Sequence, residues 1–133
     1  MTAGYSKTLL VKKLGIKPGF RVHFRRPPEQ LESNLGPLPR DVEVKKTLRG
    51  SFDFIHAFET RRRELGRVFP RLKTALRKSG ALWLSWAKQS SGRQTDQSGG
   101  EVRSIGLGLV DIKVCAVDDT WSGLKLVYRE LDR

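Results

Sequence analysis

Polar and charged side chains of this 133-residue sequence gather in the stretches that follow apolar segments. Lysine and arginine pair with phosphate or carboxylate, serine and threonine add hydroxyl hydrogen bonds, and tryptophan can stack on a base. These residue types predict a site for an anionic ligand. The candidate ligand-binding residues are Arg25, Arg26, Lys88, Ser90, Ser91, Thr95, Asp96, Asp118, Asp119, Trp121 and Ser122. In the alternative interpretation, pairs such as Asp96 with Lys88, or Asp119 with Arg26, only tie loops together. Trp121 could equally fill the core.

Motifs for catalysis or metal binding are not found in the sequence. No stretch has Ser-His-Asp spacing, a Walker loop, GxSxG or a metal-ligand pattern, so no catalytic residue can be named. The single cysteine, Cys115, excludes an internal disulfide framework and a cysteine-based zinc site. No metal and no cofactor are predicted. His56 lies within an apolar segment, which favours a satisfied core group over a ligand.

The charge of the chain is strongly positive. There are 26 Lys+Arg against 14 Asp+Glu, a net charge of +12, which favours polyanionic partners such as nucleic acid. The hypothesis for polyanion binding is a basic helix face made of Arg63, Arg67, Arg71, Arg77 and Lys78. The alternative is an ordinary solvated face. No segment approaches a membrane span, so we expect a cytoplasmic protein with no membrane partner. The oligomeric state stays open.

The elements that position these residues follow from periodicity. A short apolar run, Ala81–Ala87, indicates a strand buried on both faces. The strongest helical signal covers Glu59–Ser79, with Pro70 expected to kink this helix or begin a second one, and Gly80 to cap its end. Further helices are predicted over Lys7–Leu14, Pro28–Leu35 and Glu101–Leu107. Further strands are predicted over Phe20–Phe24, Val42–Lys45, Ser51–Phe58, Val110–Val117 and Leu124–Arg129.

This order of elements predicts a single α/β domain over residues 1–133, three-layered and Rossmann-like. The sheet should have about six strands, mostly parallel, in the order 2-1-3-4-6-5, and should end in an antiparallel hairpin. The connection from Lys45 to Ser51 is short for a parallel crossover, so the second strand could be displaced or antiparallel. Ligands of open α/β sheets sit at the carboxyl ends of the strands. The loops after strands one, three, four and five should therefore meet there.

Two stretches resemble class I methyltransferases. Leu14–Val22 looks like the entry to the first strand of that fold, and Leu72–Trp86 looks like the approach to a later central strand. The resemblance implies glycines after the first strand and an acid after the second. The sequence has no glycine in His23–Pro28, and it has lysines at positions 45 and 46. These departures argue against S-adenosylmethionine catalysis.

A longer resemblance covers nearly the whole chain. It rests on Gly4-Tyr5-Ser6, Leu14–Gly19, Gly36-Pro37-Leu38-Pro39, Ala81–Ser91, Thr95-Asp96 and a C-terminal block from Gly108 to Lys125. These residues resemble the bacterial family named as domain of unknown function 3052. The family brings no assigned activity, cofactor or catalytic residue.

Three functions compete on this sequence. The first is a non-catalytic binding or regulatory domain that recognises an anionic ligand or partner at the strand ends. The second is nucleic-acid binding through the basic face between Arg61 and Lys78. The third is a diverged small transferase that uses Asp96 or Asp119 as a base. The sequence favours the first, with an enzyme less expected.

Overall fold

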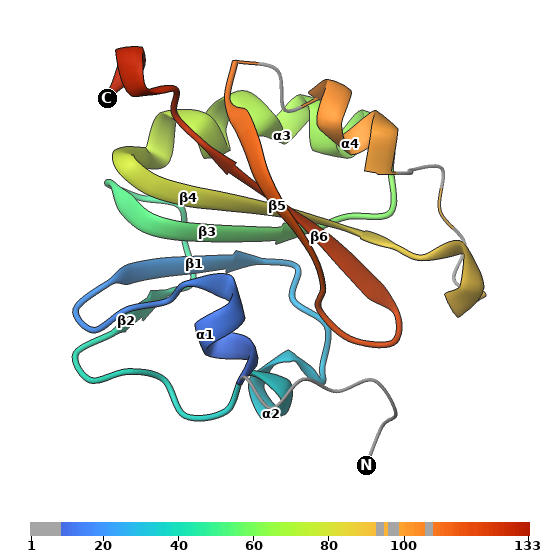
Figure 1. The fold of residues 1–133 in the computed structure, drawn as a ribbon, viewed down its shortest axis with the longest axis horizontal. Helices are drawn as coiled ribbons and strands as arrows, with labels where there is room; N and C mark the ends of the chain where they lie inside the picture. The colour runs from blue at the N-terminus through green and yellow to red at the C-terminus, as the bar shows by residue number, and fades with distance from the viewer. Residues whose placement is uncertain (1–8, 93–94, 96–98, 106–107) are drawn as a thin grey trace.

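The structure is a computed structural model, and it describes residues 9–92, 95, 99–105 and 108–133 (Figure 1). In chain order, the helices and strands are α1 (Leu10–Leu14), β1 (Arg21–Arg25), α2 (Leu31–Leu35), β2 (Glu43–Lys45), β3 (Phe52–Phe58), α3 (Arg62–Ala75), β4 (Leu76–Ala87), α4 (Gly99–Ile105), β5 (Val110–Ala116) and β6 (Trp121–Val127). Short 3-10 helices lie at Gln89–Ser91 and Glu130–Asp132. No helix in these described ranges is long and apolar enough to cross a membrane.

The six strands form one sheet in the order β2-β1-β3-β4-β6-β5. Strands β1 to β4 pair in parallel, and β6 pairs antiparallel with both β4 and β5. Strand β5 therefore runs in the same direction as the first four. This confirms the predicted α/β fold class, the strand order and the closing hairpin. The second strand, whose direction the sequence left open, is parallel.

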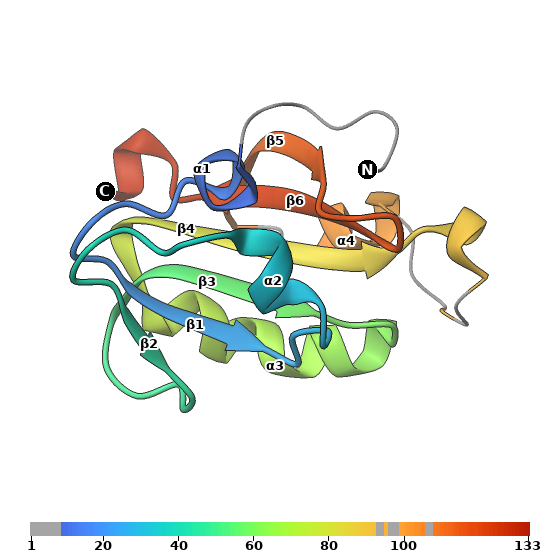
Figure 2. The same cartoon turned by 90° about the horizontal axis from the view of Figure 1, so that it is seen from below.

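Two apolar clusters lie on opposite faces of the sheet. One cluster contains the apolar faces of α1 and α2, and the other contains those of α3 and α4. Figure 2 shows α1 and α3 on opposite sides of the sheet. Trp83 of β4 is fully buried, and its indole N–H donates a hydrogen bond to the Leu14 carbonyl oxygen at 2.9 Å. This bond fixes the end of α1 on the sheet.

The junction between α3 and β4 differs from the prediction. Helix α3 ends at Ala75 and continues through Pro70, while residues 76–79 belong to β4 rather than to the helix. Strand pairing with β3 outweighs helical periodicity here, since Leu76 pairs with Phe52 and Ala81 with Phe54. The intervening residues bulge outward.

Asp53 and Gly80 explain how the bulge is held. The Asp53 carboxylate accepts hydrogen bonds from the Arg21 backbone N–H and the Arg77 guanidinium, both at 2.8 Å. A Cβ atom on Gly80 would lie 2.8 Å from the Asp53 carbonyl oxygen, so the close approach requires glycine. Gly80 is therefore not a helix cap. Arg77 and Lys78, predicted on the basic helix face, lie in β4 instead.

Candidate functional site

Strands β1, β3 and β4 all end on the same side of the sheet, at the right of Figure 1. We call this side the carboxyl edge. Several loops are joined there by hydrogen bonds. The Thr95 hydroxyl donates to the Thr60 carbonyl oxygen at 2.9 Å, and the Glu59 backbone N–H donates to the Ser85 carbonyl oxygen at 3.2 Å. The loops after β3 and β4 therefore meet, as the topology predicts.

Lys88 and Asp118 hold loops together, but not as a side-chain pair. The Lys88 ammonium donates to the Asp118 carbonyl oxygen at 2.8 Å. The Asp118 carboxylate accepts the backbone N–H groups of Thr120 at 2.8 Å and Trp121 at 2.7 Å. These contacts satisfy the lysine and the aspartate within the β5–β6 hairpin region. Their geometry fits the loop-tying alternative.

The remaining predicted residues of these two loops are spread out. The Ser91 hydroxyl donates to the Lys88 carbonyl oxygen at 2.6 Å, whereas Ser90 and Asp119 are exposed. Ser122 lies within β6 and pairs with β4 and β5. Asp96 lies outside the described residues.

Trp121 fills the core next to the carboxyl edge. Only 5% of its surface is exposed, and its ring packs edge-on against Phe58 with centroids 5.3 Å apart. Such edge-to-face pairs contribute to stability beyond their buried area. The buried position matches the core alternative, although one side of the residue borders a cavity described below.

Arginines and glutamates form a network between β1 and α3. Arg25 and Arg67 both donate to the Glu64 carboxylate, Arg25 at 3.1 Å. Arg26 donates to the Glu59 carboxylate at 3.1 Å. Glu59 is 3% exposed and also accepts the backbone N–H groups of Thr60 and Arg61, which explains how a buried carboxylate is tolerated.

The charges of this network shift its pKa values. Burial is the main cause that lowers the pKa of Arg25, and the neighbouring Arg26 adds to it. The hydrogen bond from Arg67 is the main cause that lowers the pKa of the Glu64 carboxyl. The arginines around Glu64 therefore favour its ionised form.

Two neighbouring cavities open at the carboxyl edge. The first, here called the β2 cavity, has a volume of about 590 Å³ and apolar walls that include Phe24, Leu31 and Val44. The second, here called the Trp121 cavity, has a volume of about 450 Å³ and is lined in part by Arg26, Glu59 and Trp121. Pro27, Pro28 and Glu29 line both. Volumes of this size are typical of small-molecule sites, roughly 300–1,000 Å³.

The turn after β1 has an unusual backbone. Arg26 adopts a φ of 50°, in the left-handed region that glycine favours and that costs other residues about 1–2 kcal/mol. The chain thus makes a glycine-like turn at the end of the first strand without a glycine. Helix α2 begins only at Leu31 rather than at Pro28 and has five residues, so it offers no anion site at its start.

Sequence reasoning identified the edge but missed several of its residues. Glu59, Glu29 and Glu32 border the cavities and were not among the predicted site residues. Glu59 had a usable signal, because it is an acid directly after a largely apolar strand and so lies at the carboxyl edge. Glu29 and Glu32 had no such signal, since the cavity exists only once α2 lies beside β2.

Comparison with known proteins identifies the fold. No protein-family model matches the chain, and no curated protein matches it in sequence. Magnesium protoporphyrin IX methyltransferase from Synechocystis PCC 6803, solved with bound S-adenosylmethionine, matches with a TM-score of 0.58 and 12% identity over 90% of this chain and 74% of that chain. A SAM-dependent methyltransferase from Aquifex aeolicus gives a TM-score of 0.53 and 15% identity over 88% and 86%. Fibrillarin of Methanococcus jannaschii, a pre-rRNA processing protein, gives 0.57 and 8% identity over 92% and 74%.

These similarities define the class of fold and correct two predictions. The chain has the Rossmann-like fold of S-adenosylmethionine-dependent methyltransferases, and at these identities the similarity shows the fold alone. We predicted a non-catalytic binding domain and argued against S-adenosylmethionine-dependent activity. Both are wrong in the light of these matches. Both predictions rested on the absence of a glycine after β1 and of an acid after β2.

Proposed function

We propose that this protein is a small, diverged transferase that binds S-adenosylmethionine at the carboxyl edge. The observation that carries the proposal is an apolar cavity at the ends of β1 and β2, on a sheet with the strand order and directions described above. In open α/β sheets this is the edge where ligands bind. The methyltransferase fold of the solved neighbours supports the same location.

The residues of the β2 cavity fit an adenosyl group in their chemistry. Phe24, Leu35 and Val44 give apolar walls suited to a flat base. Glu29 and Glu32 supply carboxylates that can accept hydrogen bonds from ribose hydroxyls. These carboxylates come from the segment around α2, whereas Lys45 and Lys46 stand at the end of β2.

The β2 cavity and the Trp121 cavity share a wall, so one can hold the methyl donor and the other the acceptor. When bound, S-adenosylmethionine supplies an electrophilic methyl group. Because Pro27, Pro28 and Glu29 border both cavities, a donor in the β2 cavity would have the Trp121 cavity beside it for the acceptor. Glu59 is fully engaged by Arg26 and two backbone N–H groups, so we assign it the positioning of the loop after β3. Asp119 lines neither cavity, which does not support it as a base.

Nucleic acid is the acceptor class that we propose. The chain carries a net charge of +12, and Arg61 and Arg63 are exposed where the loop after β3 leads into α3. Arginine suits phosphate because its planar fork can donate two hydrogen bonds at once. The pre-rRNA processing role given for the fibrillarin neighbour is consistent with such an acceptor.

Two expectations about identity also remain proposals. Membership of the domain of unknown function 3052 family rests on the C-terminal block between Gly108 and Lys125 and the shorter stretches quoted with it. A cytoplasmic location would give the protein access to both S-adenosylmethionine and RNA. Neither proposal is needed for the binding experiment that follows.

Filling the β2 cavity tests the proposed donor site. Val44 is 48% exposed on edge strand β2, so Val44→Trp can occupy the cavity without disturbing the core. We expect isothermal titration calorimetry to show S-adenosylhomocysteine binding to the unmodified protein. We expect at least a tenfold weaker affinity for Val44→Trp, because the added ring takes the space of the base.

The matched control for this experiment is Val110→Trp on the opposite edge strand. Val110 is 38% exposed and distant in the sheet order, so its affinity should equal that of the unmodified protein. Transfer of tritium from labelled S-adenosylmethionine to mixed-sequence RNA should follow the same pattern. If the unmodified protein does not bind S-adenosylhomocysteine, or if Val44→Trp binds it as tightly as the unmodified protein does, the proposed donor site is wrong.

A further inference from the structure

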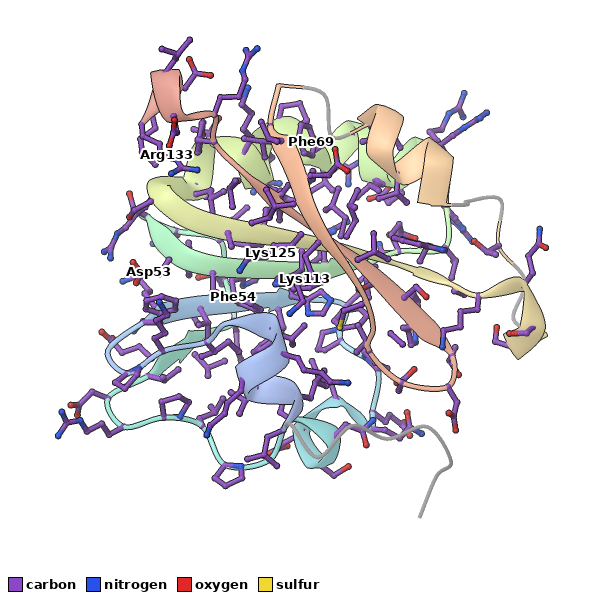
Figure 3. All side chains as sticks on the ribbon, viewed as in Figure 1. Asp53, Phe54, Phe69, Lys113, Lys125 and Arg133 are labelled. Atoms are coloured by element: carbon purple, nitrogen blue, oxygen red, sulfur yellow. The ribbon has the colours of Figure 1, made fainter. Side chains whose placement is uncertain are left out.

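A third cavity lies at the opposite edge of the sheet, where β4 begins and the chain ends. It has a volume of about 500 Å³ and lies between the end of α3 and the segment that follows β6. Its charged lining residues are Lys73, Lys78, Arg129 and Asp132. Figure 3 shows Asp53 and Arg133 on this side of the molecule, away from the carboxyl edge. We call this third cavity the Lys73/Lys78 cavity.

Tyr128 organises the two lysines of this cavity. The Lys78 ammonium lies 4.3 Å and the Lys73 ammonium 6.0 Å from the centre of the Tyr128 ring. The Tyr128 hydroxyl donates a hydrogen bond to the Lys73 carbonyl oxygen at 2.7 Å. Only 6% of Tyr128 is exposed, so its ring is a fixed surface that both flexible ammonium groups approach.

The positive charge of the cavity is not neutralised by its own residues. Asp132 pairs with Arg129, with its carboxylate oxygen 3.2 Å from the Arg129 Nε atom. Within the described part of the chain, no carboxylate pairs with Lys73 or Lys78. Two like charges held near one ring repel each other, and a bound anion would relieve that repulsion.

Gly108 also lines this cavity. Its φ is 99°, and a Cβ atom there would lie 2.7 Å from the Lys73 ammonium. Any other residue would therefore have to displace Lys73. The glycine thus allows the backbone to pass close to the ammonium.

The basic surface continues from this cavity along α3. Pro70 and Thr74 line both the Lys73/Lys78 cavity and an adjoining one of about 380 Å³, to which Arg71 contributes. Arg63, Arg67 and Arg71 follow at intervals of four residues, about 6 Å of helix rise each, toward the carboxyl edge. All three arginines are exposed, although Arg67 shares its charge with Glu64. The surface suits a chain of phosphates better than a single ion.

We propose that the Lys73/Lys78 cavity binds a backbone phosphate of a polynucleotide that crosses α3 toward the candidate site. Lys73 and Lys78 contact the phosphate, Tyr128 positions them, and Arg71 and Arg63 extend the track. This site would hold the nucleic-acid acceptor of the proposed transferase. The binding of RNA does not depend on the proposed function, but the role of that RNA as an acceptor rests on it.

The experiment compares two double variants that remove the same charge. Lys73→Gln/Lys78→Gln neutralises the cavity, and Lys12→Gln/Lys17→Gln neutralises two exposed lysines in and beside α1, on the other face of the sheet. Binding of a 20-nucleotide mixed-sequence single-stranded RNA is measured between 50 and 300 mM KCl. We expect the cavity variant to bind at least fivefold more weakly at 100 mM. Its slope of log K against log salt should be less negative by about 0.7, because one phosphate contact is lost and each contact contributes about 0.7 for a single strand.

Each outcome of this experiment bears on the proposal. The control variant should stay within twofold of the unmodified protein, and inorganic phosphate at 10 mM should not displace the RNA. Equal weakening in both double variants, or RNA binding that neither variant changes, overturns the assigned site. Displacement of the RNA by 10 mM phosphate, or phosphate binding without RNA binding, overturns the polynucleotide as the ligand. S-adenosylhomocysteine titration of the same proteins separates the two hypotheses, since the cavity variant should retain donor binding at the β2 cavity.

Discussion

His56 makes the stability of this protein depend on pH. Its side chain is fully buried in the sheet, where Nε2 lies 2.7 Å from the Ser85 hydroxyl oxygen and Nδ1 has no hydrogen-bond partner. Burial lowers the pKa of His56 from 6.5 to about 3. The unfolded chain therefore binds a proton between those two values that the folded protein does not bind. Stability is greatest above pH 6.5 and falls as the pH decreases toward 3.

The size of the effect follows from the two pKa values. Each pH unit within this window changes the free energy of unfolding by 1.36 kcal/mol for one proton. Between pH 7.5 and pH 5 the contribution of His56 falls by about 2 kcal/mol, since the unfolded state gains most of its protonation below 6.5. Other ionisable groups add their own pH dependence, so the quantity to measure is a difference between variants.

Urea unfolding of the unmodified protein and of His56→Gln at pH 7.5 and pH 5 measures that difference. Gln keeps an amide that can hydrogen-bond to Ser85 and does not titrate. We expect the unmodified protein to lose about 2 kcal/mol more than His56→Gln between these pH values. Equal pH dependence in the unmodified protein and His56→Gln would refute the assignment.

Two further predictions concern the fold. Gly80→Ala should destabilise the protein by about 1–3 kcal/mol in urea unfolding, because its Cβ would lie 2.8 Å from the Asp53 carbonyl oxygen. Gly66→Ala in α3, where a Cβ meets nothing within 4 Å, should instead stabilise it by about 0.5–1 kcal/mol, and an equal effect of both changes would contradict the bulge described here. Trp83→Phe should cost about 2–4 kcal/mol, since it leaves the Leu14 carbonyl oxygen unpaired and a void in the core. Trp86→Phe on the other face of β4 should cost clearly less, and a loss no larger for Trp83 would mean that the bond to Leu14 does not anchor α1.

Local patterns were sufficient to predict most of the fold. The apolar run from Leu82 to Trp86 indicated a buried strand, and the alternation of segments indicated an α/β sheet. The carboxyl edge followed from the same order, because parallel strands bring their ends together. The exposure of Arg63, Arg67 and Arg71 could also be predicted, because their spacing places them opposite the buried face of α3.

Tertiary structure decided what the sequence left ambiguous or had wrong. The segment from Leu76 to Ser79 has helical periodicity, but pairing with Phe52 draws it into β4 and takes Arg77 and Lys78 away from the helix. The hydrogen bond from Lys88 to the Asp118 carbonyl oxygen, and those from the hairpin backbone to the Asp118 carboxylate, appear only in the folded chain. The cavity beside Glu29 and Val44, and the approach of Lys73 and Lys78 to the Tyr128 ring, join residues far apart in the sequence. Sequence periodicity reports which face of one element is buried, whereas a binding site depends on which elements meet, and only the folded chain determines that.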